Sequence, residues 1–275
     1  MYCNEKVMFV KVITLATLKG GAGKTMTTFN IAGILSENNK ILLIDVDPQC
    51  NLTNDVGIDI SDRNMITIRD VLQNPINIQP KIDSIIIKNP IQELPNLDII
   101  PSSILLFETE RRLYTRSNRE HILEIFLNKN KEYLQQYDYI FIDTNPSMSI
   151  INVNALFIAD SILITSDVSI NSVNGAELFC QLWDEQRQDL LKTDNIAAML
   201  ICNYDNRTNM GKDMIEYVHH TDFSKHIILN TIIPTTVKMK DTEINHKPIN
   251  ILYPKEKVTK IFHDLIIELK ERSIL

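Results

Sequence analysis

A glycine-rich loop near the start of the chain constrains the fold more than any other stretch. Three of the seven glycines stand at positions 20, 21 and 23, between the apolar run 12–17 and the helical pattern 26–35. Glycine costs stability unless the backbone must turn sharply or approach a ligand closely. A strand, a glycine loop and a helix in this order predict a cradle whose backbone N–H groups point at phosphate oxygens. The sequence therefore predicts an α/β fold with a phosphate-binding loop after its first strand.

The residue types in this loop predict how a phosphate is held. The loop reads Lys19-Gly20-Gly21-Ala22-Gly23-Lys24-Thr25. Lys24 is placed to reach terminal phosphates, and the Thr25 hydroxyl is placed to hold Mg²⁺. The ordinary pattern requires glycine five residues before Gly23, and Leu18 stands there instead. A second lysine, Lys19, heads the loop, where it can neutralise phosphate charge in its own site or in a partner's site.

The stretch KGGAGKT resembles the deviant Walker A box of the ParA/MinD ATPase family, whose signature is the extra lysine. The resemblance implies ATP as the nucleotide, Mg²⁺ as the metal, and a homodimer in which Lys19 acts across the interface. The residues expected to bind ATP through the backbone of the loop are Gly20, Gly21, Ala22, Gly23 and Met26. Met26 stands where relatives usually have a second threonine, so we expect retained nucleotide binding with slow turnover.

Two aspartates follow the next predicted strand. The aliphatic run 41–44 is typical of a buried strand in a parallel sheet, and it leads into Asp45-Val46-Asp47-Pro48-Gln49. Carboxylates at the carboxyl end of such a strand lie at the edge of the ligand crevice. The stretch resembles the D-x-D-P-Q box of ParA and Soj, which implies that Asp47 orients the attacking water and that Asp45 supports the Mg²⁺ site. A turn with helix caps is the alternative that these residues leave open.

A third aliphatic strand is predicted at 139–143, and it ends in Asp143. An acid at a strand end that accepts a hydrogen bond from a Mg²⁺-bound water has the form of a Walker B residue. The residues after Asp143 are Thr-Asn-Pro-Ser, where relatives read D-T-P-P-S or D-x-A-P-S, so Asn145 departs from the family while Pro146 and Ser147 match. We expect this loop to sense the γ-phosphate and to move on hydrolysis.

Candidate contacts to the base and to DNA come from the second half of the chain. Asn203 follows a predicted strand at 196–202, and its amide can donate and accept at an adenine edge, although a turn-forming asparagine fits equally well. The run 232–238 resembles the IPRNVR segment that borders the base pocket in relatives, which implies a base contact from Pro234. The resemblance also implies nonspecific DNA contacts. The candidates, for which ordinary solvated lysines are an equal alternative, are Lys212, Lys225, Lys238 and Lys240.

Two further apolar patterns predict helices. The spacing over 119–136 predicts a helix against the sheet. The spacing over 258–269 gives one apolar helix face, which either packs on the sheet or lies on a membrane as in MinD. The polar face of this second helix mixes acids and bases, whereas an anionic membrane would prefer a basic face. We therefore favour packing on the sheet.

Length and composition favour one domain over residues 1–275, because no Pro/Gly/Ser-rich linker divides the chain. No apolar run approaches the length of a membrane span, and residues 1–11 carry no signal pattern, so a cytoplasmic protein is expected. The four cysteines are scattered, as is typical of reduced thiols. The net charge of −7 argues against whole-surface binding to nucleic acid but allows a local basic patch.

The sequence thus predicts a single P-loop domain whose mainly parallel, twisted sheet is flanked by helices on both faces. The resemblance to ParA and Soj runs from Lys11 to about Ile266 and leaves no room for an N-terminal helix-turn-helix extension. It implies an ATPase of plasmid or chromosome partition, whose ATP-bound dimer binds nucleoid DNA nonspecifically until a centromere-bound ParB-like adaptor stimulates hydrolysis. A MinD-like membrane-cycling ATPase is the alternative. An iron–sulfur reductase would need cluster cysteines, one of them after the Walker B strand, and residues 144–170 contain none. A tyrosine autokinase would need a terminal tyrosine cluster, and residues 271–275 contain no tyrosine.

Overall fold

The computed structural model describes residues 10–62, 64–205, 215–218, 221 and 223–275. Its centre is an eight-stranded sheet in the order β3-β4-β2-β5-β1-β6-β7-β8, in which only the edge strand β3 runs antiparallel to its neighbour. The strands are β1 (Lys11–Ala16), β2 (Ile41–Asp45), β3 (Ile87–Lys88), β4 (Leu97–Ile100), β5 (Tyr139–Asp143), β6 (Ser161–Ser166), β7 (Ile196–Tyr204) and β8 (Ile228–Pro234).

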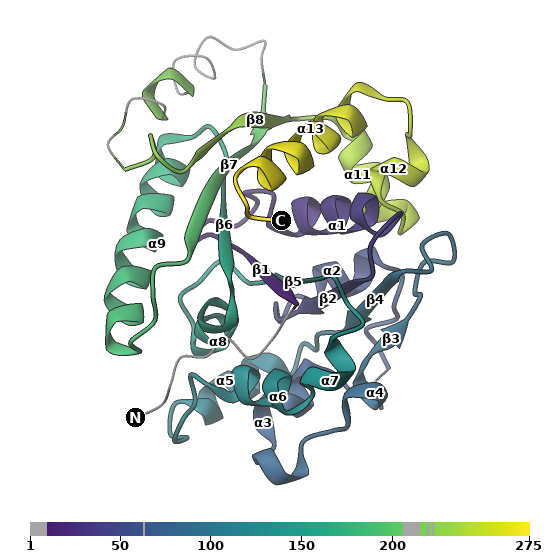
Figure 1. Cartoon of the computed structure of the whole chain (residues 1–275), viewed down its shortest axis with the longest axis vertical. Coiled ribbons are helices and arrows are strands. Elements are labelled where there is room, and N and C mark those ends of the chain that lie inside the picture. The colour runs from purple at the N-terminus through teal and green to yellow at the C-terminus, as the bar shows by residue number, and fades with distance from the viewer. Residues whose placement is uncertain (1–9, 63, 206–214, 219–220, 222) are drawn as a thin grey trace.

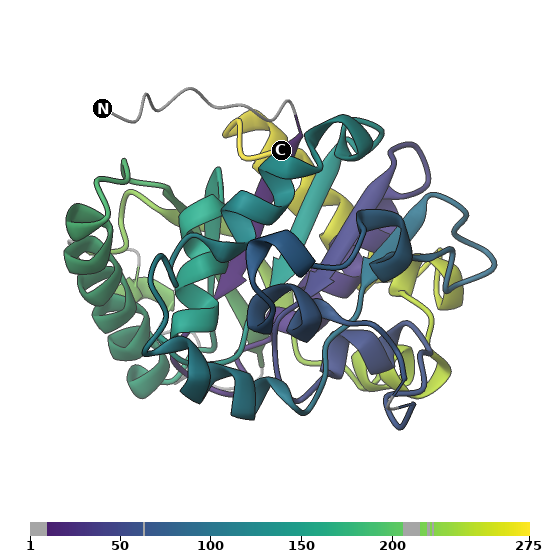
Figure 2. The same ribbon diagram turned by 90° about the horizontal axis from the view of Figure 1, so that it is seen from below.

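Helices cover both faces of the sheet (Figures 1 and 2). One face carries α1 (Lys24–Leu35), α2 (Asn51–Asp55), α11 (Val237–Asn245), α12 (Ile249–Leu252) and α13 (Lys257–Glu271). The other carries α3 (Ile68–Gln73), α4 (Ile82–Ile85), α5 (Leu106–Leu113), α6 (Ile122–Lys129), α7 (Lys131–Leu134), α8 (Ile150–Ile158) and α9 (Ile170–Asp189), with the 3-10 turn η1 (Ile76–Ile78) nearby. The predicted fold class is confirmed.

Alternation along the strands divides the apolar side chains between two cores. In β1, Val12 and Ala16 enter the core under α8 and α9, whereas Ile13 and Leu15 enter the core under α1 and α13. Successive side chains of a strand point to opposite faces, so a strand covered on both faces must be apolar at nearly every position. The continuous aliphatic runs of the sequence therefore form the middle of the sheet.

The helix predicted over 119–136 is two helices, α6 and α7, which meet at Asn130. The Asn130 side chain donates to the Phe126 carbonyl oxygen at 2.8 Å. A side-chain amide that bonds to the backbone in this way competes with continuation of the helix. The break is therefore local, and both helices still pack on the sheet.

The C-terminal helix α13 packs on β8 and α1, as the favoured interpretation predicts. Glu268 of this helix accepts hydrogen bonds from the backbone N–H groups of Asn230 (2.7 Å) and Thr231 (2.8 Å) in β8. These bonds satisfy donors on the edge strand of the sheet, where unpaired backbone groups invite association. Within the described ranges, none of the helices has the length and apolar character that crossing a membrane requires.

Candidate active site

The predicted site residues meet at the carboxyl ends of the central strands. β5 lies between β1 and β2, and the strand register aligns Asp143 with Leu15 on one side and with Asp45 on the other. The loop 17–23 continues from β1, so it lies directly beside both acids. Parallel strands place their carboxyl ends at one edge of the sheet, where a ligand crevice opens. The topology therefore brings together residues that are far apart in the sequence.

The glycines of the loop have different functions. Gly21 (φ 76°) and Gly23 (φ 86°) adopt left-handed backbone conformations, and Gly23 directly precedes α1. A Cβ on Gly23 would lie 2.8 Å from the Cβ of Cys202 in β7, which is an impossible contact. A Cβ on Gly20 or Gly21 would meet nothing within 4 Å. The loop is thus packed tightly on the sheet at its last glycine and is open where a phosphate would approach.

Lys24 and Thr25 begin α1 and face the acids. Lys24 is only 7% exposed, and burial lowers its pKa although Asp143 and Asp47 act in the opposite direction. The Thr25 hydroxyl donates to Asp143 Oδ2 at 2.6 Å. A buried ammonium beside carboxylates lies in a low-dielectric environment, where its interaction with an added phosphate is strong.

Asp45 uses both carboxylate oxygens inside the protein. Its Oδ1 accepts from the Asp47 N–H at 3.0 Å, and its Oδ2 accepts from the Thr53 N–H at 2.9 Å and from the Thr53 hydroxyl at 2.7 Å. Burial, followed by the charge of Asp143, raises the pKa of Asp45 well above its ordinary value. Asp45 therefore orients the turn that carries Asp47, which agrees with a supporting position at a metal site.

Asp47 points into the same crevice. It is 5% exposed, its Oδ1 accepts from the Gln49 N–H at 2.8 Å, and its backbone oxygen accepts from the Ser102 hydroxyl at 2.7 Å. Burial raises the pKa of Asp47, against the Gln49 bond and the charge of Lys24. Ser102 also donates its N–H to Thr53 Oγ1 at 2.9 Å, so the end of β4 holds both acidic positions in place. Sequence reasoning missed Ser102, for which the chain gives no motif.

Asp143 has the chemistry of a Mg²⁺ ligand or of an acceptor for Mg²⁺-bound water. Burial raises its pKa to about 7, with a further increase from Asp47, although Lys24, Thr25 and Thr28 lower it. With Thr25 it supplies two oxygen donors of the kind that Mg²⁺ prefers. No cluster of three or more His, Cys, Asp or Glu that could hold a metal occurs in the described part of the chain. Two protein oxygens fit Mg²⁺ bound together with a nucleotide, because such an ion keeps phosphate and water ligands.

Asn203 of β7 contacts the loop, whereas Pro234 lies at the end of the neighbouring strand β8. The Asn203 side-chain nitrogen donates to the Gly21 carbonyl oxygen at 2.9 Å, so it braces the loop and leaves the amide oxygen for a base. Pro234 lines a cavity of about 640 Å³ together with Tyr204 and Lys238. This cavity lies at the carboxyl ends of β7 and β8, where the base contact is predicted.

The three candidate DNA lysines that the structure describes do not form one strip. Lys225 precedes β8, whereas Lys238 and Lys240 follow it, so they lie at opposite ends of that strand. Lys238 forms an ion pair with Glu256 at 2.5 Å, and Lys240 is exposed. Lys212 lies outside the described residues.

Comparison with known proteins agrees with this geometry. A family profile described as an AAA domain matches residues 10–196. The chain is 34% identical over 262 residues to the sporulation initiation inhibitor protein Soj of Bacillus subtilis, covering 94% of this chain and 97% of Soj. The chain belongs to the ParA/MinD family of P-loop ATPases. The chromosome partitioning protein ParA of Myxococcus xanthus is 30% identical over 264 residues, covering 96% of this chain and 89% of that protein.

The ParA/MinD assignment extends to solved structures. A plasmid partition protein of Borrelia burgdorferi, described as putative and bound to AMPPNP, aligns with a TM-score of 0.74 and 25% identity over 96% of this chain and 99% of that one. The fold, the loop and the acids thus belong to a nucleotide-hydrolysing ATPase of the family that works in partition or positioning.

In this ParA/MinD-family chain the signature lysine is held within its own subunit. Lys19 Nζ lies 2.6 Å from Asp167 Oδ2 and 2.7 Å from the Ser169 hydroxyl. Ser169 is also the N-cap of α9 and accepts from the Ser172 N–H. Burial alone raises the pKa of Asp167, but Lys19 and the Ser169 bonds outweigh this effect and lower it. Sequence reasoning missed Asp167 and Ser169, because they are polar residues in a loop with no motif of their own.

Proposed function

We propose that this ParA/MinD-family protein is a DNA-partitioning ATPase of the cytoplasm. ATP closes a homodimer, the dimer binds nucleoid DNA without sequence preference, and a ParB-like adaptor at a centromere site stimulates hydrolysis and release. The observation that carries the proposal is the convergence of Lys19, Lys24, Asp47 and Asp143 at one edge of the sheet. Similarity to Soj and to two partition proteins supports a partition function rather than a general ATPase.

The positions of these residues support a different role for each of them in ATP hydrolysis. Lys24 stabilises charge on the terminal phosphates, and Asp47 orients the attacking water. Thr25 and Asp143 hold Mg²⁺, which neutralises phosphate charge when it is bound. For Lys19 to act on the other subunit's phosphates, its bonds to Asp167 and Ser169 must open. Dimer closure therefore exchanges an ion pair within one subunit for a contact with phosphate.

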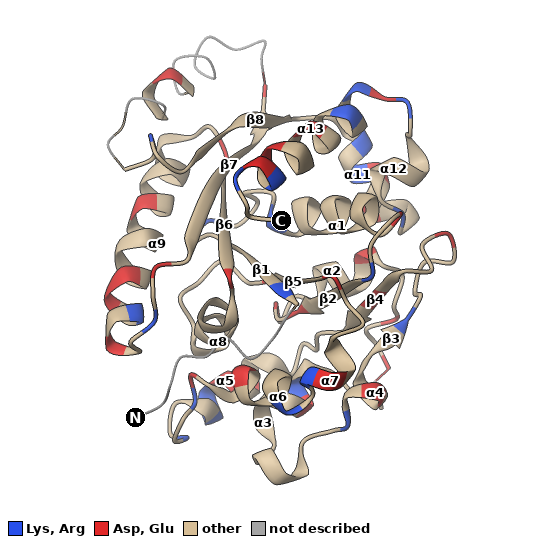
Figure 3. Cartoon of the chain, viewed as in Figure 1, with Lys and Arg blue, Asp and Glu red and all other residues tan. Residues whose placement is uncertain are grey.

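The proposed DNA contacts lie beyond β8. Lysines and acids lie together on α11 and around the start of α13 (Figure 3). The lysines are Lys238 and Lys240 on α11, Lys247 between α11 and α12, Lys255 before α13, and Lys257 and Lys260 in α13, and the acids among them include Asp241, Glu243 and Glu256. Because the whole chain carries a net charge of −7, such a local patch is the arrangement that allows phosphate contacts. Of the candidates, we retain exposed Lys240 as the first contact to test.

ATP-dependent binding to DNA of random sequence tests the proposal. We expect binding with ATP and Mg²⁺, and little binding without nucleotide. Asp47→Ala should keep ATP and DNA binding while hydrolysis falls on the order of 100-fold, since it removes the group that orients water. Lys24→Ala should lose both activities and serves as the control. Equal DNA binding without nucleotide would refute the switch, and ATP-dependent sedimentation with anionic liposomes would favour the MinD-like alternative.

A further inference from the structure

One buried side chain holds the loop that follows Asp143. Asn152 lies in the first turn of α8 and is 2% exposed. Its Nδ2 lies 2.8 Å from the Asn145 carbonyl oxygen, 2.7 Å from Asn145 Oδ1 and 2.8 Å from the Ser147 carbonyl oxygen. The Ser147 hydroxyl in turn donates to Asn145 Oδ1. Asn152 therefore gathers both ends of the turn 145–147 around a single amide.

The loop is anchored separately at its two ends. The Thr144 hydroxyl donates to the Leu15 carbonyl oxygen in β1 at 2.7 Å. Ser149 caps α8 by accepting from the Asn152 N–H at 3.4 Å. Between these anchors, only residues 145–148 can move without breaking the strand or the helix. The Asn152 side chain is placed to control this short turn.

The bonding at this amide is uneven. An asparagine NH₂ group has two hydrogens, and three oxygens lie within 2.8 Å of the Asn152 nitrogen. Its own Oδ1 is buried and has no hydrogen-bond partner in the described part of the chain. The hydrogens must therefore be shared, and the turn can shift from one pair of acceptors to another while the amide stays in place. This arrangement holds the turn and still permits a small displacement.

The bond from Asn152 matters because of the residue that stands at position 145. Asn145 stands where the related boxes D-T-P-P-S and D-x-A-P-S have proline or alanine, neither of which has a side-chain acceptor, and proline also fixes its own backbone angle φ. Asparagine leaves the backbone freer, so another restraint is needed to hold the turn in one position. We infer that Asn145 and Asn152 form an amide lock that positions the turn after Asp143 against the terminal phosphate of ATP. This inference rests on the proposed function, and it makes Asn152 a positioning residue.

Kinetics and nucleotide affinities of matched variants test the lock. Asn152→Ala and Asn145→Ala should each lower kcat about tenfold, because a misplacement near 1 Å at a reacting centre is costly, with little change in the KM for ATP. Calorimetry with Mg²⁺–AMPPNP and Mg²⁺–ADP should show a several-fold loss of preference for the triphosphate. The double variant should behave like either single variant. Asn128→Ala on α6, remote from the loop, is the control and should change neither quantity.

Rescue by proline separates positioning from a general effect on stability. Asn145→Pro should retain activity, and in that background Asn152→Ala should have little further effect on kcat or on the affinity ratio. Any of three results would overturn the lock. The two alanine variants could have additive effects, Asn152→Ala could have its full effect in the Asn145→Pro background, or the affinities for AMPPNP and ADP could fall equally. If the unaltered protein shows no hydrolysis or DNA binding, the proposed function fails, while the affinity ratios still decide the lock. If Asn152→Ala does not fold, Asn145→Ala decides through the same ratio.

Discussion

At the scale of single residues, the site consists of ionisable side chains that are buried close to one another. Asp143 and Asp45 are fully buried neighbours on adjacent strands, and Lys24 lies nearly buried beside them. Desolvation disfavours the ionised form of each group, so the protein holds these charges together at a cost in free energy. A bound nucleotide with Mg²⁺ changes this balance, because the metal favours ionised Asp143 and the phosphates favour charged Lys24.

The raised pKa of Asp143, about 7, predicts that Mg²⁺–nucleotide binding depends on pH. Below pH 7 Asp143 of the folded protein carries a proton that the metal must displace, so the affinity for Mg²⁺–nucleotide should fall about tenfold per pH unit for one proton. Calorimetry with Mg²⁺–AMPPNP in buffers of different ionisation heat should detect close to one proton released at pH 6 and little at pH 8.

The raised pKa of Asp143 also predicts in which direction the unfolding free energy changes with pH. Because the pKa is higher in the folded than in the unfolded protein, protonated Asp143 contributes stability below pH 4 that is lost as pH rises toward 7. Asp143→Asn should therefore flatten this part of the dependence of the unfolding free energy on pH. Proton release that persists unchanged in Asp143→Asn would assign the effect to another group.

At the scale of elements, the loop between β1 and α1 depends on its contact with β7. Gly23 must adopt a left-handed conformation and must also lie against Cys202, whereas Gly20 has open space around it. Asn203, the next residue of β7, bonds to Gly21. The phosphate loop is therefore held by two contacts with β7, one at Gly23 and one at Gly21. β7 lies two strands away from β1 in the sheet.

Alanine substitutions at Gly23 and at Gly20 should have different effects on the stability of the fold. Gly23→Ala should lower the free energy of unfolding by about 2 kcal/mol or more, since the left-handed conformation alone costs roughly 1–2 kcal/mol and the Cys202 contact adds to it. Gly20→Ala should change the unfolding free energy by less than about 0.5 kcal/mol. Urea denaturation of both variants makes the measurement, and equal losses at the two positions would contradict this assignment.

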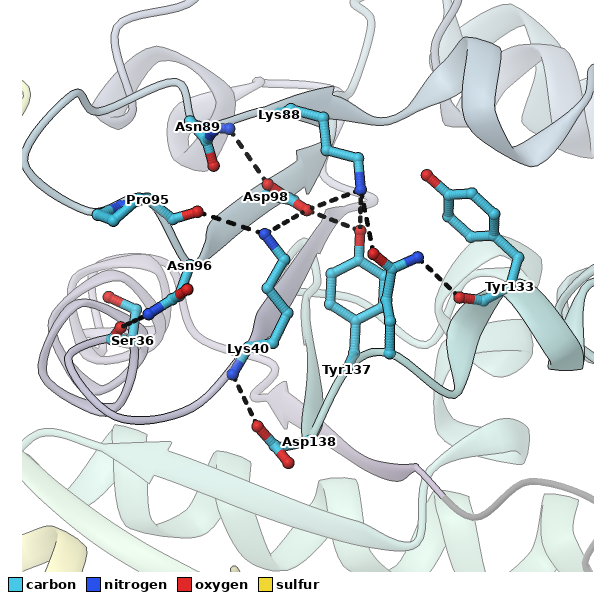
Figure 4. A network of polar contacts seen from close by, with 11 residues as sticks. Ser36, Lys40, Lys88, Asn89, Pro95, Asn96, Asp98, Tyr133, Tyr137 and Asp138 are labelled. Atoms are coloured by element: carbon cyan, nitrogen blue, oxygen red, sulfur yellow. Dashed lines mark hydrogen bonds and ion pairs between the residues drawn. The ribbon is translucent and has the colours of Figure 1, made fainter.

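At the scale of the whole molecule, a second polar network lies at the amino ends of β2, β4 and β5, whereas the site lies at the carboxyl ends of the strands. Figure 4 shows this network from close by. Asp98 is fully buried and accepts from the Tyr137 hydroxyl at 2.8 Å, with Lys40 at 3.0 Å and Lys88 at 3.1 Å. Burial by itself raises the pKa of Asp98, but the bonds from Lys40, Tyr137, Asn89 and Lys88 outweigh it and lower the pKa. The network joins β2, β3 and β4 to the segment before β5.

Removing this carboxylate should destabilise the fold without changing the site. Asp98→Ala removes the acceptor of the buried Tyr137 hydroxyl and the carboxylate partner of Lys40 and Lys88. Because both ammonium groups reach water, we expect a loss of about 1–3 kcal/mol in unfolding free energy. The KM for ATP should stay unchanged, because the network and the phosphate loop lie at opposite ends of the strands. Exposed Asp83→Ala is the control and should leave stability unchanged. A raised KM in a folded Asp98→Ala protein would show coupling between the two ends.

The sequence by itself determined the sheet and the catalytic edge. Short continuous aliphatic runs bounded by turn residues are typical of strands covered on both faces, and a parallel sheet aligns their carboxyl ends. The glycine loop, Asp47 and Asp143 therefore had to meet once the strands were recognised. Local signals were sufficient here because each residue stands at the end of its own strand.

Only the tertiary structure decided which polar groups those residues touch. Lys19 bonds to Asp167, 148 positions away, and Asn203 bonds to Gly21 across the sheet. Asn152 bonds to Asn145, and Asp98 bonds to two lysines and a tyrosine, although neither Asn152 nor Asp98 was singled out by a motif. Such contacts depend on distances between side chains on different elements. Periodicity fixes the face on which a residue lies, but packing fixes its neighbour.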